Sequence, residues 1–160
     1  MKTLLPLAAE IGARLKDRGE TVAVSESSSG GLISAALLAA PGASAWYRGG
    51  GVIYTAQAFK GLMGLTRDDI EGMRSSSEPY ARFMAGTIRT RLRATWGLCE
   101  TGAAGPSGNP YGDAAGHTCV AVIGETLEAS RTLETADINR EENMRRFAME
   151  ALELMREALD

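Results

Sequence analysis

The stretch Thr21–Ala40 (TVAVSESSSGGLISAALLAA) constrains most strongly what this chain can fold into. It begins with a β-type run, continues through the serine- and glycine-rich segment Glu26–Gly31, and ends in apolar residues at helical spacing. A strand, a loop of small residues and a helix in this order place backbone N–H groups and hydroxyls at a helix N-terminus. Such a terminus suits a phosphate, a carboxylate or a developing oxyanion. The alternative is an ordinary strand-to-helix turn in which the serines serve only as caps.

Helix and strand patterns alternate along the rest of the chain. In the first half of the chain they predict a helix with the buried face Leu4, Ala8, Ile11 and Leu15, a strand at Ala45–Tyr54, and short helices at Thr55–Leu65 and near Asp68. A further helix is opened by Ser76 or Ser77 followed by Glu78 and Pro79. After it the patterns predict a strand at Thr95–Glu100, paired strands at His117–Ile123 and Leu127–Leu133, and a long last helix capped by Asp137 or Asn139. We therefore expect an α/β fold, a three-layer α/β/α sandwich with a mixed, mostly parallel sheet. The sandwich is expected to form a single domain over residues 1–160.

A second unusual segment is Thr101–Gly112, which holds four glycines and two prolines. It is either a disordered tip or a binding loop on the carboxyl side of a strand. In three-layer α/β folds, ligands bind beyond the carboxyl ends of the strands. We therefore expect this loop and the Ser27–Gly31 turn to meet at one cleft, where they hold an anion beside a reactive hydroxyl.

Charge and composition exclude several classes of function. A net charge of -3, with no arginine-rich run interleaved with aromatic residues, argues against a nucleic-acid partner. The arginines at 82, 89, 91 and 93 are most simply the solvated side of a helix, with a phosphate-binding patch as the alternative. Cys99, Cys119 and the single His117 are too few and too scattered for a zinc site, so no metal is expected. Both cysteines are expected to be free buried thiols.

The first residues, Lys2 to Ala9, could be mistaken for a signal peptide, but Ile11 and Leu15 continue the apolar pattern as an amphipathic helix. No segment approaches the length of a membrane span, so we expect a cytoplasmic protein without a membrane partner. Gly49–Gly51 and apolar surface residues permit a homo-dimer but do not require one.

Three stretches in order resemble the motifs of one family. Ser25–Gly31 resembles A-E-S-C-T-G-G, Gly51–Thr55 resembles G-V-x-T-Y-S, and Thr101–Pro106 resembles T-G-I-A-G-P. The chain is identified on these motifs as similar to the CinA C-terminal domain family, the nicotinamide mononucleotide amidohydrolases. The likeness covers essentially the whole chain.

The resemblance implies hydrolysis of the amide of nicotinamide mononucleotide to nicotinic acid mononucleotide and ammonia, with no metal or organic cofactor. It carries the family's serine nucleophile to Ser27, its tyrosine to Tyr54 and its loop threonine to Thr101. The substrate, a small nucleotide, would be bound by backbone and side-chain groups of Ser28, Ser29, Gly30, Gly31, Gly102, Ala104 and Gly105, and by Arg140 or Arg145.

Amide hydrolysis needs a nucleophile, a base that activates it, and donors for the tetrahedral oxyanion. Ser27 lies where the N–H groups of Ser28–Gly31 could serve as donors. The position of the lone histidine leaves lysine or tyrosine as the partner of the serine, and Tyr54 and Lys60 are the candidates. The family's lysine, however, corresponds to Phe59, and on a helix one residue is a rotation of about 100°.

This departure supports a second hypothesis of a different class. The chain would then be a non-catalytic relative that binds a nucleotide-like ligand or a protein partner without turnover. A third hypothesis is a flavodoxin-like cofactor carrier, for which Trp46 and Tyr47 are the available aromatic pair. The position of Lys60 decides between the first two. A lysine amine within hydrogen-bond reach of Ser27 supports catalysis, whereas an outward Lys60 with Phe59 in the pocket favours binding alone.

Overall fold

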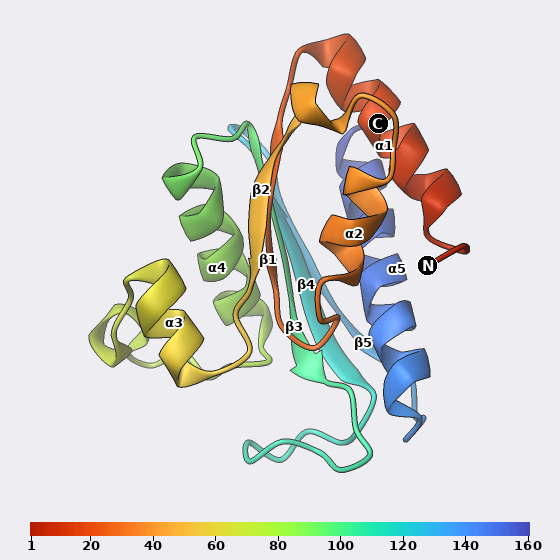
Figure 1. The fold of residues 1–160 in the computed structure, drawn as a ribbon. Coiled ribbons are helices and arrows are strands. Elements are labelled where there is room, and N and C mark those ends of the chain that lie inside the picture. Colours follow the sequence, from red (N-terminus) through yellow and green to blue (C-terminus); the bar gives the residue numbers. More distant parts are fainter.

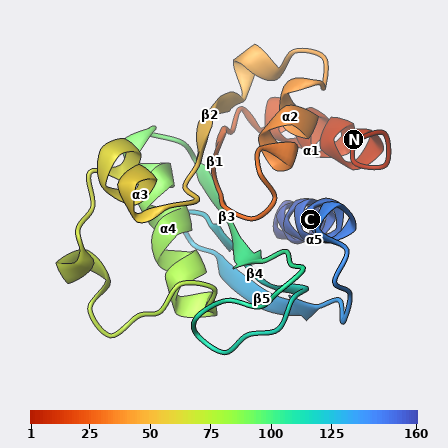
Figure 2. The same ribbon diagram turned by 60° about the horizontal axis from the view of Figure 1, so that its bottom comes forward.

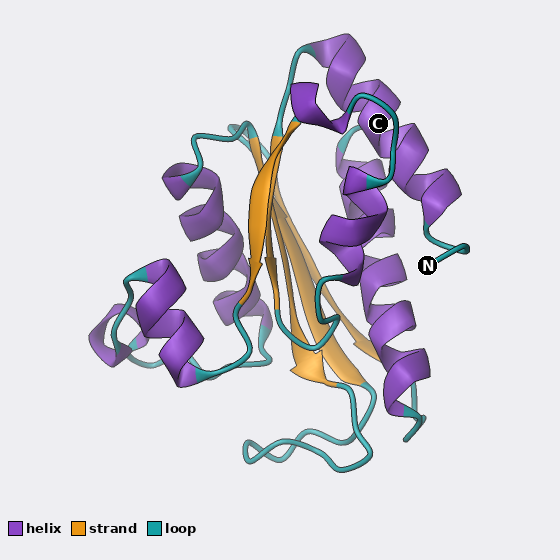
Figure 3. Ribbon diagram, in the orientation of Figure 1, coloured by secondary structure: helices purple, strands orange, loops and turns teal.

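The structure is a computed structural model that describes all of residues 1–160. A five-stranded sheet lies between two layers of helices (Figures 1 and 3). The strands are β1 (Val22–Glu26), β2 (Tyr47–Val52), β3 (Trp96–Ala103), β4 (His117–Ile123) and β5 (Glu128–Glu134), and the α-helices are α1 (Leu5–Arg18), α2 (Leu32–Leu38), α3 (Ala56–Met63), α4 (Glu78–Arg91) and α5 (Arg140–Ala158). Short 3₁₀ helices cover Ala43–Ala45 and Arg67–Ile70.

The sheet has the order β2-β1-β3-β4-β5. β1 runs parallel to both β2 and β3, while β4 runs antiparallel to β3 and to β5. Every strand except β4 therefore points the same way, which confirms the mixed, mostly parallel sheet. The carboxyl end of β1 lies beside the middle of β3, since Ser25 is paired with Cys99, and β3 continues past it to Ala103.

Each face of the sheet has its own apolar core. One core lies under α1, α2 and α5 and includes the expected face of Leu4, Ala8, Ile11 and Leu15, all fully buried. The other lies under α3 and α4 and includes Phe59, Tyr80 and Met84. Figure 2 shows the two helical layers on opposite sides of the strands. The three-layer α/β/α arrangement is confirmed.

One element differs from the sequence prediction in a way that matters for the site. β3 was expected to end at Glu100 but continues to Ala103, because Thr101, Gly102 and Ala103 pair with Cys119, Thr118 and His117 of β4. The glycine-rich loop therefore begins at Ala104. The antiparallel pairing with β4 gives the backbone groups of these residues their hydrogen-bond partners. The composition of the segment alone does not predict a strand here.

The helix starts follow the capping signals in the sequence. The Ser77 hydroxyl accepts the Tyr80 N–H at the start of α4, and the Asn139 side chain accepts the Glu142 N–H at the start of α5. Cys99 and Cys119 are buried free thiols, as predicted. No helix combines the length and the apolar character needed to cross a bilayer.

Candidate functional site

The serine-lined turn after β1 and the end of β3 meet at one edge of the sheet. The Ser28 hydroxyl donates to the Gly102 carbonyl at 2.5 Å. The N–H groups of Ser27 and Ser29 donate to one carboxylate oxygen of Glu100, at 3.1 and 2.8 Å. Figures 1 and 3 show both segments at the same end of the strands. The expected convergence of the two segments is confirmed.

A buried glutamate from β1, Glu26, caps helix α2. It is 1% exposed, and its Oε2 accepts the Ser29 hydroxyl at 2.9 Å and the Gly31 and Ile33 N–H groups at 2.9 and 3.0 Å. Its Oε1 accepts both the N–H and the hydroxyl of Ser34, at 2.8 and 2.5 Å. Three of these five groups are backbone N–H donors at the start of α2, so the Glu26 carboxyl meets the positive end of the helix.

The capping by Glu26 changes the expected role of the turn. We expected the N–H groups of Ser28–Gly31 to face a ligand. Instead the Ser29 N–H bonds Glu100, the Gly30 N–H bonds the Ser27 carbonyl at 3.1 Å, and the Gly31 N–H bonds Glu26. Ser28 and Ser29 are themselves buried. Two carboxyl groups and one backbone carbonyl of the protein thus accept three of the four N–H groups that the sequence pattern offers to an anion.

Glu100, from β3, is fully buried beside Glu26. Burial raises its pKa, as does the nearby charge of Glu26, and this outweighs the opposing effect of the hydrogen bonds from Ser29 and Ser27. Its Oε1 lies 3.1 Å from the Thr118 hydroxyl, which also lies 3.2 Å from the Thr101 carbonyl. A protonated Glu100 fits this chain, because it can donate to Thr118 while Thr118 donates to Thr101.

A pocket of about 430 Å³ lies beside these turns, on the α3 and α4 side of the sheet. Four of the predicted residues line it: Ser27, Tyr54, Thr101 and Gly102. The rest of its wall is formed by Ile53, Thr55, Ala56, Phe59, Arg67, Ile70, Ser75, Ser76, Tyr80, Asn109, Pro110 and Tyr111. The pocket is the place where the hydroxyl of Ser27 can meet a ligand, and we take it as the candidate active site.

Phe59 and Lys60 lie as the one-residue shift predicts. Phe59 is buried on the pocket wall, where its ring stacks on Tyr80 with centroids 6.4 Å apart and an interplanar angle of 25°. Lys60 is exposed, does not line the pocket and forms no hydrogen bond or ion pair. The helix rotation between neighbouring residues explains why the aromatic ring, and not the amine, faces the pocket.

Arg140 and Arg145 do not line the pocket. Arg140 donates to the Gly105 carbonyl at 2.6 Å and to the Tyr54 hydroxyl at 3.0 Å, and its guanidinium lies over the Tyr54 ring. Arg145 is paired with Glu141 and Glu142 on its own helix. Arg140 thus braces Tyr54 against the glycine-rich loop, and Arg145 is a surface residue. Gly30, Gly31, Ala104 and Gly105 also lie off the pocket wall.

The pocket includes residues that sequence reasoning missed. Arg67 is the single charged side chain on its wall, and it makes no bond to another protein group. Burial raises the pKa of Tyr80 to about 12, so its phenol keeps its proton. Tyr111 and Ser76 come from two further segments. No local motif marks these positions, and no cluster of His, Cys, Asp and Glu is arranged to hold a metal ion.

A larger, open groove of about 660 Å³ follows the outer face of α4 and includes three of the arginines. Arg82 pairs with Glu78 and Glu128, and Arg89 donates to the Thr95 carbonyl at 2.8 Å. These partners favour the solvated helix side over a phosphate-binding patch. The groove lies away from the two turns and contains none of the predicted site residues.

The comparisons with known proteins agree with the motifs and the fold. The model of the CinA C-terminal domain matches residues 4–159, and the chain belongs to this family. A CinA-like protein of Desulfosudis oleivorans is 37% identical over 155 residues, which are 97% of this chain and 38% of that protein. A CinA-like protein of Nostoc sp. is 36% identical over 78% of this chain and 29% of its own length. The chain therefore spans well under half of these curated relatives.

Solved structures show the same fold. The competence or damage-inducible protein of Enterobacter asburiae superimposes with a TM-score of 0.90 at 26% identity, over 98% of both chains. The competence/damage inducible protein CihA of Agrobacterium tumefaciens gives 0.88 at 29% identity, over 98% of this chain and 94% of the other.

Proposed function

We propose that this CinA-family domain binds a nicotinamide mononucleotide-like ligand in the pocket and does not hydrolyse it by a serine–lysine mechanism. The position of Phe59 carries the proposal. A buried aromatic ring occupies the place where the family motif has its lysine, and Lys60 points to solvent.

The pocket's composition supports binding of a flat, anionic ligand. Its wall combines the rings of Tyr54, Phe59, Tyr80 and Tyr111 with several hydroxyls and one guanidinium. No carboxylate lines it. Aromatic rings stack on a flat heterocycle, hydroxyls bond a ribose or an amide, and an arginine attracts a phosphate. A mononucleotide has all three parts.

The same wall lacks a group that could activate Ser27. A serine nucleophile needs a neighbour that accepts its proton near neutral pH. The titratable groups that line the pocket are Arg67 and three tyrosines, and the phenol of Tyr80 stays protonated. No lysine, histidine or carboxylate faces the pocket. The unassisted hydroxyl of Ser27 is a weak nucleophile.

One observation favours amide hydrolysis as a second candidate function. The Ser27 hydroxyl lines the pocket and bonds no other protein group, so it is free to attack. In that case the products are nicotinic acid mononucleotide and ammonia, with Tyr54 and Thr101 beside the reacting amide. Lys60 would have to turn inward by local rearrangement of α3 to serve as the base.

Two measurements on one preparation test the proposal. Calorimetric titration with nicotinamide mononucleotide should show saturable binding, weaker for nicotinamide riboside, which lacks the phosphate. An ammonia assay at high protein concentration should show no release over hours. Ammonia release that Ser27→Ala abolishes supports the amidohydrolase instead. Absence of binding from a folded preparation rejects the ligand class.

A further inference from the structure

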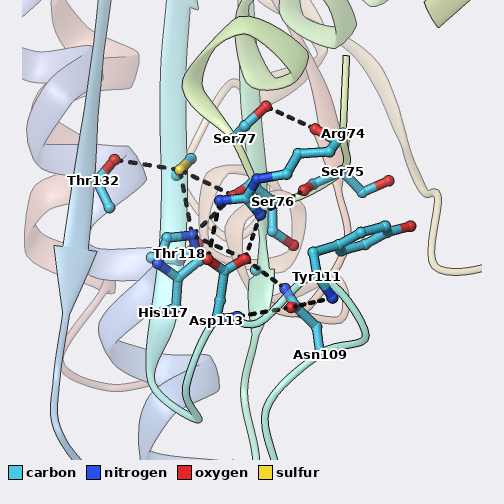
Figure 4. Close-up of polar contacts among 12 residues, drawn as sticks. Arg74, Ser75, Ser76, Ser77, Asn109, Tyr111, Asp113, His117, Thr118 and Thr132 are labelled. Carbon is cyan, nitrogen blue, oxygen red and sulfur yellow. Dashed lines mark hydrogen bonds and ion pairs between the residues drawn. The ribbon is translucent and has the colours of Figure 1, made fainter. Parts of the chain in front are cut away.

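His117, the chain's single histidine, is buried on β4 with a hydrogen-bond acceptor at each ring nitrogen. Its Nε2 lies 2.8 Å from the Ser76 carbonyl oxygen (Figure 4). Its Nδ1 contacts the Glu134 carboxylate. A carbonyl and a carboxylate both accept hydrogen bonds, so this pair of neighbours favours the imidazolium, in which both ring nitrogens carry hydrogen.

The charged surroundings of the ring are mostly negative. Asp113 of the glycine-rich loop has its Oδ2 3.7 Å from Nε2 and is itself held by Arg74 at 2.5 and 3.0 Å. The titratable and charged groups around the ring are Glu134 of β5, Asp113 of the loop, Arg74 before α4, Cys119 of β4 and Glu78 of α4. Burial lowers the pKa of His117, but bonds to Glu134 and Ser76 and the charge of Asp113 outweigh it, so the pKa is raised.

Two segments of the pocket wall converge on this imidazolium. Ser76 is 4% exposed and has the left-handed φ of 57°, which a serine adopts only under constraint. Its N–H donates to the Thr101 hydroxyl at 3.3 Å, and both residues line the pocket. On the other side, Asp113 accepts the Asn109 side-chain amide at 2.8 Å, and Asn109 also lines the pocket.

We propose that His117 is a positioning residue whose positive charge holds the Ser76 and Asp113 segments in place, so that ligand binding weakens when the imidazolium loses its proton. The binding part rests on the proposed function. In the neutral ring the remaining hydrogen stays on Nε2, because the Ser76 carbonyl is buried whereas the Glu134 side chain, 58% exposed, can turn to water. The bond to Ser76 then loses its charge assistance, and the attraction to Asp113 disappears.

The first experiment uses the free protein. A single histidine gives unambiguous ring signals in an NMR titration from pH 5 to 9. We expect a midpoint above the ordinary value of about 6.5, with the Ser76 and Thr101 amide signals moving at the same midpoint. Glu134→Gln should lower the midpoint, and Glu125→Gln, an exposed and unbonded glutamate of the β4–β5 turn, should not. A midpoint at or below the ordinary value, or amides that do not follow it, overturns the proposal.

The second experiment measures nicotinamide mononucleotide binding from pH 7 to 9, where the phosphate stays ionised. We expect affinity to fall about fivefold, because a charge-assisted hydrogen bond is roughly twice as strong as a neutral one. Affinity should be flat in His117→Gln, which keeps a donor for Ser76. A wild-type profile as flat as that of the variant overturns the coupling. Absence of binding at every pH rejects the proposed function, and the free-protein titration then decides on His117 alone.

Discussion

The ring of Phe59 stacks on that of Tyr80 at 6.4 Å, at the position where the family motif places an amine. We expect Phe59→Lys to release ammonia from nicotinamide mononucleotide at least about tenfold faster than wild type, because a desolvated lysine can act as a base for Ser27. Phe59→Leu, which leaves the pocket apolar, is the matched control. Equal rates in both variants would show that the missing base is not what limits turnover. The same assay with the double variant Phe59→Lys, Ser27→Ala checks that any new activity passes through the serine.

The two buried glutamates should respond differently to the same substitution. Glu26→Gln turns an amide NH₂ toward N–H and O–H donors, and we expect a loss of about 2–4 kcal/mol in the free energy of unfolding. Glu100→Gln should stay within about 1 kcal/mol of wild type, because its NH₂ can donate to the Thr118 hydroxyl while its oxygen accepts the Ser27 and Ser29 N–H groups. Urea unfolding at pH 7 measures both. Similar losses would mean that Glu100 does not donate to Thr118.

The bond from Ser28 to Gly102 joins the two segments beside the pocket. Ser28→Ala removes the donor from a half-buried carbonyl, and we expect a loss of about 1–2 kcal/mol in the free energy of unfolding. Ser107→Ala, at an exposed and unbonded serine of the glycine-rich loop, should change it by less than about 0.5 kcal/mol. Hydrogen exchange should also quicken at Gly102 in the first variant. A neutral Ser28→Ala would show that the two turns hold their positions independently.

Arg67 is the pocket's single cationic side chain. We expect Arg67→Gln to weaken nicotinamide mononucleotide binding about threefold or more, with a smaller effect at high salt, since exposed charge contacts are screened. Nicotinamide riboside, without the phosphate, should be unaffected. Arg93→Gln, at an exposed arginine away from the pocket, is the control. An equal loss for both ligands would place Arg67 against the ring or the ribose.

The pairing of Asp113 with Arg74 should make the stability of the protein depend on pH. The hydrogen bonds from Arg74 lower its pKa most, so its contribution to stability is present above the ordinary carboxyl value of about 3.9 and is lost as the pH falls through the lower folded value. Arg74→Gln should therefore lower the thermal midpoint at pH 7, and the gap from wild type should narrow as the pH falls below the ordinary carboxyl value. A gap that stays constant with pH would mean that Arg74 acts by packing alone.

Much of the fold follows from local signals, and the exceptions are instructive. Apolar periodicity located the buried face of α1, and the cap signals located the starts of α4 and α5 to within two residues. The end of β3 was wrong because the residues Thr101–Ala103 are strand only through their pairing with β4. The strand propensity of a segment carries no information about a partner strand that comes later in the chain.

The site was predicted less completely, for a related reason. The motifs pointed to Ser27, Tyr54 and Thr101, and all three line the pocket. The shift from lysine to Phe59 was also visible in the sequence. The use of the turn's N–H groups by Glu26 and Glu100 was not, because Glu100 lies 71 residues from Ser29 along the chain. The serine turn alone predicts a binding site for an anion, whereas in the structure Glu26 of the same segment and the distant Glu100 accept its N–H groups.

Arg140, the first residue of α5, holds both Tyr54 and the Gly105 carbonyl without entering the pocket. The C-terminal helix therefore supports a pocket wall whose residues come almost wholly from the middle of the chain. A protein cut before this helix would lose more than part of its core. Tyr54 on the pocket wall would also lose the side chain that links it to the Gly105 carbonyl.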